Sequence, residues 1–219
     1  GDAVGDEETV ITSCYFIDCF ATNKEGYAVS TRSYSLLINY SFFQDHKRQL
    51  NEDNSKSSIL YIEMDEEIAP ILDSCTFENN SFVSAIALKA KCAVNITNFV
   101  FNNYDDMIPC INIDLWDVTE KVILHGFKFS NIKDSRCVYM SEEKSFITEI
   151  SYCQFNNTSI ESERSMTGYL NPDGSCILSY QYGNIKVTYC NFTNNHAKGH
   201  GGAIFADTQS IDINNCRFV

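Results

Sequence analysis

A phenylalanine recurs along this chain at intervals of 24 to 37 residues, and similar residues surround it each time. The recurring positions are Phe16, Phe43, Phe77, Phe101, Phe129, Phe155, Phe192 and Phe218. An acidic or amide residue stands two positions after all but the last, at Asp18, Asp45, Asn79, Asn103, Asn131, Asn157 and Asn194. Self-similarity at a period of about 20–50 residues is typical of repeat proteins, whose units stack on one another. The recurrence therefore predicts a solenoid.

Each repeat also carries a period-2 pattern ahead of its phenylalanine. Apolar side chains seven and five positions before it alternate with polar ones, as in Leu36 and Ile38, Val94 and Ile96, Val122 and Leu124, Ile185 and Val187, and Ile211 and Ile213. This alternation indicates a half-buried strand. A second apolar run follows, at Ala28-Val29, Ala85-Ile86, Cys110-Ile111, Cys137-Val138, Cys176-Ile177 and Ala203-Ile204. Each unit therefore predicts two or three strands and no helix.

A unit this short cannot bury its own apolar face, but stacked units form one continuous core. We therefore predict an all-β fold, a right-handed parallel β-helix of about seven to eight rungs, with residues 1–219 in a single domain. The phenylalanine column and the Asn/Asp column are both expected to point inward as ladders. Asn and Asp suit a bend because they tolerate left-handed backbone, and stacked amides can hydrogen-bond along the axis.

Two repeats are longer than the rest, and their extra residues are polar. The insertions fall near 45–57 and 159–174. Insertions in a solenoid map to loops on its flank, which either serve in binding or are merely tolerated at the surface.

The first and last strands expected, Thr9 to Phe16 and Ile211 to Phe218, are the same strand of the repeat, and neither end shows a polar cap. Solenoids usually cap their ends. Three expectations follow: a longer parent solenoid, a separate capping element, or copies stacked head to tail into a filament.

The composition limits the kinds of partner that the chain can bind. The 16 basic against 29 acidic residues give a net charge of −13, which disfavours nucleic acid and anionic membranes. No apolar stretch approaches the roughly 18 residues of a membrane span. Of the six N-glycosylation sequons, Asn39, Asn95 and Asn191 stand at outward strand positions and are the glycosylation candidates. Asn79 and Asn157 belong to the column expected to point inward and are expected to stay unmodified. The sequons favour a secreted or cell-surface protein.

The cysteines fall into columns with other small or apolar residues. Cys14, Cys75, Cys153, Cys190 and Cys216 alternate with Phe99 and Phe127, while Cys110, Cys137 and Cys176 alternate with alanines. A cysteine that replaces Phe or Ala acts as a small hydrophobe, so mostly free, buried thiols are expected. Cys19 and Cys92 fit neither column and are expected to be the most exposed or most easily oxidised. No CxxC pair is present, and neither a metal nor a cofactor is predicted.

The last complete repeat reads Phe192-Thr193-Asn194-Asn195 and then Gly201-Gly202-Ala203-Ile204. These segments resemble the FxxN and GGA[ILV] motifs of the polymorphic outer-membrane protein (Pmp) repeat family, and Phe77-Glu78-Asn79-Asn80 also matches FxxN. The resemblance implies a β-helix of the pectin-lyase-like type, surface-exposed or secreted, with adhesion as a role known for several members. The partners it suggests are host or matrix glycans and proteins.

Parallel β-helices also include polysaccharide-degrading enzymes, so a catalytic role is an alternative. Asp105-Asp106, His125 and Gly199-His200-Gly201 superficially resemble the acidic-pair and GHG motifs of polygalacturonases. Glycoside hydrolysis requires carboxylates that converge on one sugar, and His200 is expected four rungs from Asp106. We therefore predict no catalytic residues, with a polysaccharide hydrolase or lyase as the alternative. Calcium binding by Asp105-Asp106 or Glu63 to Glu67, and metal binding by His196 and His200, are judged weaker than solvated charges and chance placement.

Overall fold

Three parallel β-sheets run along the whole solenoid and contain every strand of the described chain. The structure is a computed structural model that describes residues 8–19, 28–32, 35–46, 58–64, 69–81, 83–90, 92–105, 108–113, 121–142, 147–161, 173–181 and 183–219. All strands of these residues pair in parallel, and no helix occurs among them.

The bounds of the strands follow the repeat. Sheet A contains β1 (Glu8–Thr12), β4 (Ser35–Asn39), β7 (Ile71–Asp73), β10 (Val94–Thr97), β13 (Lys121–His125), β16 (Ile147–Ser151), β19 (Asn184–Thr188) and β23 (Ser210–Asn214). Sheet B contains β2 (Tyr15–Ile17), β5 (Phe42–Gln44), β8 (Thr76–Glu78), β11 (Val100–Asp105), β14 (Lys128–Lys133), β17 (Gln154–Ile160), β20 (Asn191–Thr193) and β24 (Arg217–Phe218), and β21 (His196–Ala197) also pairs with β17. Sheet C contains β3 (Val29–Arg32), β6 (Ser58–Met64), β9 (Ser84–Ala90), β12 (Ile111–Ile113), β15 (Val138–Glu142), β18 (Ile177–Gln181) and β22 (Ile204–Asp207).

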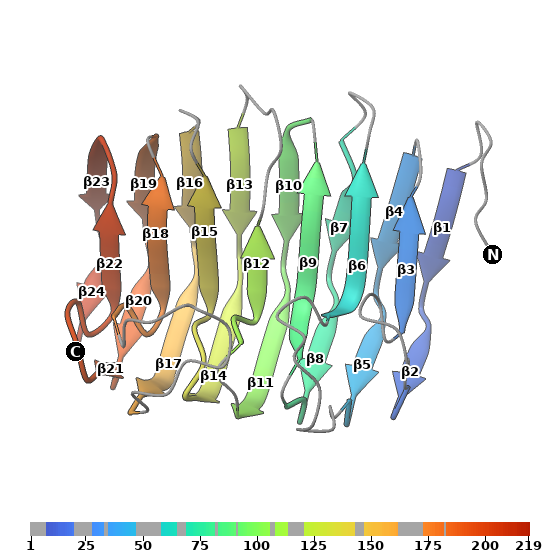
Figure 1. The fold of residues 1–219 in the computed structure, drawn as a ribbon, viewed down its shortest axis with the longest axis horizontal. Helices are drawn as coiled ribbons and strands as arrows, with labels where there is room; N and C mark the ends of the chain where they lie inside the picture. The colour runs from blue at the N-terminus through green and yellow to red at the C-terminus, as the bar shows by residue number, and fades with distance from the viewer. Residues whose placement is uncertain are drawn as a thin grey trace.

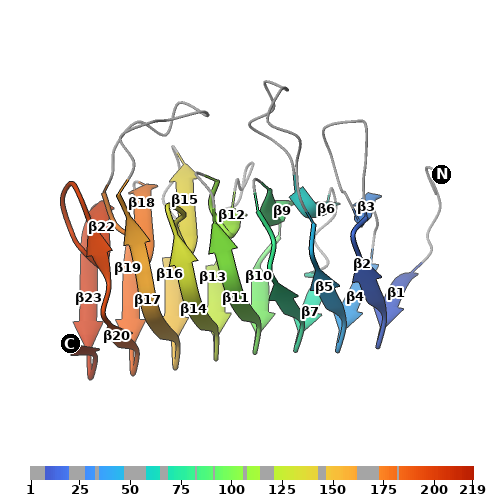
Figure 2. The same cartoon turned by 90° about the horizontal axis from the view of Figure 1, so that it is seen from below.

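Each rung contributes one strand to each sheet in turn, so paired strands are three apart in number up to β20. The extra strand β21 makes the last pairs, such as β18 with β22, four apart. In Figure 1 the sheet C strands lie in front and point up, the sheet A strands lie behind and point down, and the chain advances from right to left. This path is a right-handed coil. Figure 2 shows the same stack from below, with sheet B nearest the viewer. The parallel β-helix predicted from the repeat is confirmed, with eight strands in sheet A and seven in sheet C.

The phenylalanine column forms the centre of the core. Along it, successive rings stack at centroid distances from 4.7 to 5.1 Å and within 11° of parallel, for example Phe101 on Phe129 and Phe155 on Phe192. This distance matches the spacing of paired strands, about 4.8 Å, because the residues are in register. Each stacked pair contributes roughly 0.5–1.5 kcal/mol beyond its burial. Phe16 is half-buried and Phe218 exposed, each on an outermost rung.

The Asn/Asp column corrects the sequence prediction, because it points out of the coil. Asp45 and Asn79 are half-buried and the other five are exposed. All seven have positive φ, between 49° and 58°. The side-chain amides do stack as expected, with Nδ2 of Asn103 donating to Oδ1 of Asn79 at 3.0 Å and Nδ2 of Asn157 to Oδ1 of Asn131 at 2.9 Å. The reason for the reversal is the left-handed residue itself, which interrupts the strict in–out alternation of a strand.

The next residue after this bend explains the FxxN motif. The side chain of Asn80 is buried, with Nδ2 donating to the Phe43 carbonyl of the preceding rung at 3.2 Å and Oδ1 accepting from the His46 backbone N–H at 2.9 Å. Asn195 bonds in the same way to the Phe155 carbonyl, at 3.1 Å. The motif asparagine thus satisfies backbone groups of the rung before it. His46 is also fully buried, and this burial lowers its pKa below the ordinary 6.5.

The first glycine of the Gly201-Gly202 pair has an equally local cause. Gly201 has a φ of +61°, and a Cβ there would collide with the Ile204 carbonyl oxygen. Gly174, one rung earlier, has a φ of +59° and the same conflict with the Ile177 carbonyl. Only glycine suits this turn into sheet C, since it has neither a Cβ nor a penalty for left-handed backbone.

The cysteines are buried thiols, as their columns predicted. All ten are free, seven of them buried, and burial raises the pKa of Cys75 to about 11. The expectation for Cys92 is wrong: it lies in the core, two residues before Val94, in phase with the inward side chains of β10. Cys19 is half-buried. Of the two insertions, residues 47–57 and 162–172 lie outside the described residues.

Candidate functional site

An open groove of about 380 Å³ follows the bend of sheet B across three rungs. Its walls and floor come from β11, β14 and β17, and the residues that line it are Asn103, Tyr104, Asp105, Asn131, Ile132, Lys133, Asn157 and Ser159. We call this the amide groove. It lies along the outer side of the column that the sequence had placed inside.

The bend in each strand creates the groove. In β11 the buried residues are Phe101 and Tyr104, with Asn103 exposed between them and Asp105 exposed after them. The strand pairing resumes beyond the bend, and so Asp105 lies beside Lys133, which lies beside Ser159. One wall is therefore a row of amides and the other a row of an acid, a base and a hydroxyl, with the buried Tyr104 and Ile132 beneath.

Hydrogen bonds along the row hold the groove amides in place, and the amides retain further hydrogen-bonding capacity. A carboxamide has two N–H donors and an oxygen with two lone pairs. Nδ2 of Asn103 donates to Oδ1 of Asn79 at 3.0 Å and Oδ1 of Asn103 accepts from Asn131 at 3.2 Å, so one N–H and one lone pair of Asn103 are left for a ligand. Nδ2 of Asn131 donates to Asn102 as well as to Asn103, and its Oδ1 accepts from Asn157 at 2.9 Å, so Asn131 retains one lone pair. These groups repeat at the strand spacing of about 4.8 Å, which suits an extended polar ligand lying along the axis.

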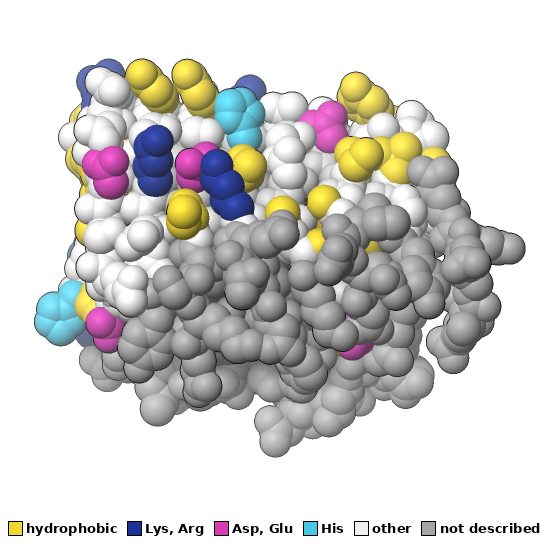
Figure 3. All heavy atoms as spheres, turned by 90° about the horizontal axis from the view of Figure 1, so that it is seen from above, with side chains coloured by type: hydrophobic (Ala, Val, Ile, Leu, Met, Phe, Trp, Pro, Cys, Tyr) yellow, Lys and Arg dark blue, Asp and Glu magenta, His cyan; other side chains and the backbone are white. Residues whose placement is uncertain are grey.

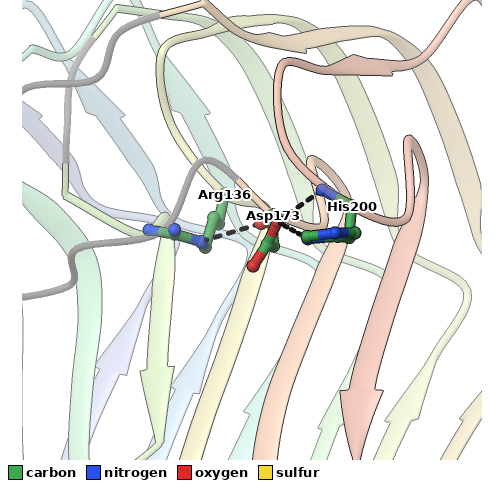
Figure 4. Close-up of polar contacts among 3 residues, drawn as sticks. All are labelled: Arg136, Asp173 and His200. Atoms are coloured by element: carbon green, nitrogen blue, oxygen red, sulfur yellow. Dashed lines mark hydrogen bonds and ion pairs between the residues drawn. The ribbon is translucent and has the colours of Figure 1, made fainter.

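A second polar cluster lies at the corner that leads into sheet C (Figure 4). The buried Asp173 accepts a hydrogen bond from the backbone N–H of His200, and its Oδ1 lies 3.2 Å from Nδ1 of the His200 ring. Nε of Arg136 donates to the Asp173 carbonyl at 3.3 Å. The cluster ties three successive rungs together. It offers one carboxylate and one exposed imidazole, whereas glycoside hydrolysis requires two carboxyl groups across the sugar.

Sequence reasoning missed Asp173, although a signal existed. Asp173-Gly174 and His200-Gly201 occupy the same place in consecutive repeats, since both glycines have positive φ and the Gly174 N–H donates to the His200 carbonyl at 3.0 Å. Aligning the two glycines would have put the acid beside the histidine. The 159–174 insertion hid this correspondence, because it displaced the repeat.

The residues that resembled polygalacturonase motifs lie in different sheets. Asp105 is in the amide groove, at the end of β11. His125 ends β13 in sheet A, where its Nδ1 lies 2.9 Å from Oγ of Ser151. His200 is at the sheet C corner, and Asp106 lies outside the described residues. The likeness in sequence therefore corresponds to no shared site.

The residues considered for metal binding are only partly described by the structure. Residues 65–67 of the acidic run lie outside the described part of the chain, and Glu63 is on β6. His196 is exposed on β21, with Nε2 3.7 Å from Oε1 of Glu161. Over the described ranges, no group of three His, Cys, Asp or Glu side chains is placed to hold a metal ion.

The outer face of sheet A is charged toward the C-terminal end. Glu149, Lys186 and Asp212 follow one another in register, and Nζ of Lys121 lies 2.7 Å from Oε2 of Glu149. Acidic and basic side chains accordingly alternate there in Figure 3. Exposed ion pairs of this kind contribute about 0–1 kcal/mol, and with both signs interspersed the face has no strong field for steering a ligand.

The three glycosylation candidates differ in environment. Asn95 on β10 and Asn191 on β20 are exposed. Asn39 is half-buried, and its Oδ1 accepts a hydrogen bond from Oγ1 of Thr12. Of the two sequons assigned to the inward column, Asn157 is in fact exposed, with its amide engaged in the row of the amide groove.

In the described part of the chain, no helix is present that could cross a membrane. Comparison of the chain with family models, with curated proteins and with solved structures yields no match.

Proposed function

We propose that this chain is a non-enzymatic, extracellular or cell-surface binding protein with an adhesin-like role, and that the amide groove is its ligand site. One observation carries the proposal: three outward asparagines, on three stacked strands, face a parallel row of Asp105, Lys133 and Ser159 across a groove of about 380 Å³. The Pmp-like motifs and the sequons support the location.

The chemistry of the groove favours a neutral, extended glycan as ligand. Sugar hydroxyls both donate and accept hydrogen bonds, the Asn103 and Asn157 amides can do the same, and Asn131 can still accept. A net charge of −13 disfavours anionic polysaccharides by long-range repulsion. The rigid sheet holds the amides in place before binding, so little conformational entropy is lost there.

A matched pair of glycine variants tests the site. Asn131→Gly removes the central amide and keeps the left-handed backbone that glycine accepts readily, since φ of Asn131 is 56°. Asn194→Gly makes the same change in the same column, outside the groove lining. Losing one net hydrogen bond of about 1 kcal/mol predicts binding weaker by roughly five- to tenfold in Asn131→Gly alone.

The assay is calorimetric or NMR titration of the full chain with a panel of neutral oligosaccharides, alongside acidic ones. Equal affinity of Asn131→Gly and the parent would contradict the amide groove as the ligand site. Failure of every neutral and acidic glycan to bind would reject the glycan class. Reducing ends that appear during incubation would show that the chain is a hydrolase, which contradicts the non-enzymatic proposal.

A further inference from the structure

The outer face of sheet A carries an apolar row toward the N-terminal end. Val10 pairs with Leu37, and Leu37 pairs with Ile71, so these side chains lie side by side on β1, β4 and β7. Val10 is 52% exposed and Ile71 59% exposed, while Leu37 is half-buried. Two strands further along the sheet, the half-buried Ile123 of β13 holds the same place in the row. Figure 3 shows the change from charged to hydrophobic side chains along this face.

Asn95 of β10 interrupts the apolar row. It pairs with Ile71 on one side and with Ile123 on the other, at the strand spacing of about 4.8 Å. Its two neighbours along β10 are buried, so its own exposed side chain points outward with those of the two isoleucines. Over the described ranges this side chain makes no hydrogen bond. An unbonded amide is therefore framed by two apolar side chains that water reaches.

The other two glycosylation candidates have polar neighbours in register. Asn191 lies between Gln154 and Arg217 on the outer face of sheet B. Asn39 is half-buried between a threonine and an aspartate, and its Oδ1 accepts a hydrogen bond from the threonine. Of the three candidates, Asn95 alone is flanked by apolar side chains on both neighbouring strands.

We propose that Asn95 carries an N-linked glycan whose first N-acetylglucosamine covers the apolar row beside it. The sequon Asn95-Ile96-Thr97 supplies the acceptor, and the isoleucines in register supply the surface that the sugar covers. In the transfer, the Asn95 amide nitrogen bonds to C1 of a polyprenyl-pyrophosphate-linked oligosaccharide, the C1–O bond to pyrophosphate breaks, the lipid pyrophosphate leaves, and the amide loses one proton. The proposal rests on the extracellular location proposed above, because the donor and its transferase belong to the secretory pathway.

A glycan at this position removes apolar surface from water without joining two copies of the chain. The C–H groups on one face of a pyranose are apolar, so their contact with aliphatic side chains is favoured by the hydrophobic effect. Left uncovered, an apolar face of a sheet is the kind of surface on which a second sheet packs. The glycan therefore protects this face from association.

The test uses the full chain secreted from eukaryotic cells, with its glycopeptides quantified by mass spectrometry. We expect Asn95 to be occupied, with nuclear Overhauser contacts between the first N-acetylglucosamine and the methyl groups of Ile71 and Ile123. Asn95→Gln and Asn191→Gln form a matched pair, since each removes one sequon from an exposed strand position. Sedimentation velocity should show self-association that increases in Asn95→Gln and is unchanged in Asn191→Gln.

A second substitution separates the apolar row from the amide. Ile71→Ser, added to Asn95→Gln, removes the most exposed side chain of the row and should return association to the level of the parent. Because Ile71 points out of the coil, this change leaves the core intact. All chains in the sedimentation series carry Phe218→Asp, so that contacts through the exposed ring on the last rung do not contribute.

The outcomes distinguish this inference from the proposed function. A secreted chain with Asn191 or Asn39 occupied and Asn95 bare overturns the inference and leaves the extracellular location supported. If all three are bare, the inference fails and the location loses the support of the sequons. An occupied Asn95 without contacts to the isoleucines, or equal association of Asn95→Gln and Asn191→Gln, overturns the covering role. Ligand binding in the amide groove is measured on unglycosylated chain and is independent of these results.

Discussion

The stacked phenylalanines make a quantitative prediction, because one ring can be removed from the middle of the column and another from its end. Phe129 is 1% exposed and stacks on Phe101 at 4.7 Å and on Phe155 at 5.1 Å. Phe218 is 52% exposed and stacks only on Phe192, at 4.7 Å, among the rings described. The two positions share side chain, sheet and register, so they differ mainly in burial and in the number of stacking partners.

The burial and the contacts set the magnitudes. Phe129→Ala leaves an enclosed cavity, and such a change costs about 3–5 kcal/mol. Phe218→Ala loses about half of a transfer free energy of roughly 1.5–3 kcal/mol plus one stack of roughly 0.5–1.5 kcal/mol, with no cavity because its site opens to solvent. We therefore expect about 1–3 kcal/mol at Phe218. The midpoints of the two ranges differ by about 2 kcal/mol, which corresponds to an unfolding constant that differs roughly 30-fold.

Urea denaturation, followed by tyrosine fluorescence and circular dichroism, measures both variants against the parent. Stacked repeats can unfold in parts, so coincidence of the two probes must be checked before free energies are compared. Equal destabilisation of Phe129→Ala and Phe218→Ala would refute the reasoning, since it would mean that enclosure and two-sided stacking do not determine the cost.

Further predictions concern a turn, a histidine, the thiols and assembly. Gly201→Ala should destabilise strongly because its Cβ would collide with backbone, whereas at Gly202 the nearest described atom lies 3.6 Å away and the change should be nearly neutral in the same denaturation assay. Burial lowers the pKa of His46, so as the pH falls the imidazole is protonated in the unfolded chain before it is protonated in the folded chain. Stability should therefore fall as pH drops below about 6.5 toward the lower folded pKa, and His46→Gln should make stability less dependent on pH in this range. Cys75, with a pKa of about 11, should react with a thiol reagent only in denaturant. Reaction of Cys75 in buffer without denaturant would contradict its burial. End-to-end stacking remains a prediction from sequence: sedimentation should show association rising with concentration and lost in Phe218→Asp, and no association at high concentration would exclude the filament.

The core of this solenoid could be predicted because it depends on periodicity. Apolar side chains at alternate positions can only be buried if the strands stack, and a phenylalanine at the same place in each repeat then stacks on itself. The free thiols followed from the same logic, since Cys153 and Cys190 share a column with Phe99 and Phe127, where a small apolar side chain is what the core accepts.

The surface depended on backbone conformation, which alternation alone does not reveal. Counting by two from Phe101 puts Asn103 inside, yet the left-handed bend at Asn103 shifts the phase by one residue, so that Asn103 points out and Tyr104 points in. The same shift buries Asn80 and brings Asp105 beside Lys133, 28 positions along the chain. The amide groove thus exists because left-handed bends interrupt a pattern that holds only within a straight strand. The φ of each bend is decided by the packed rung around it.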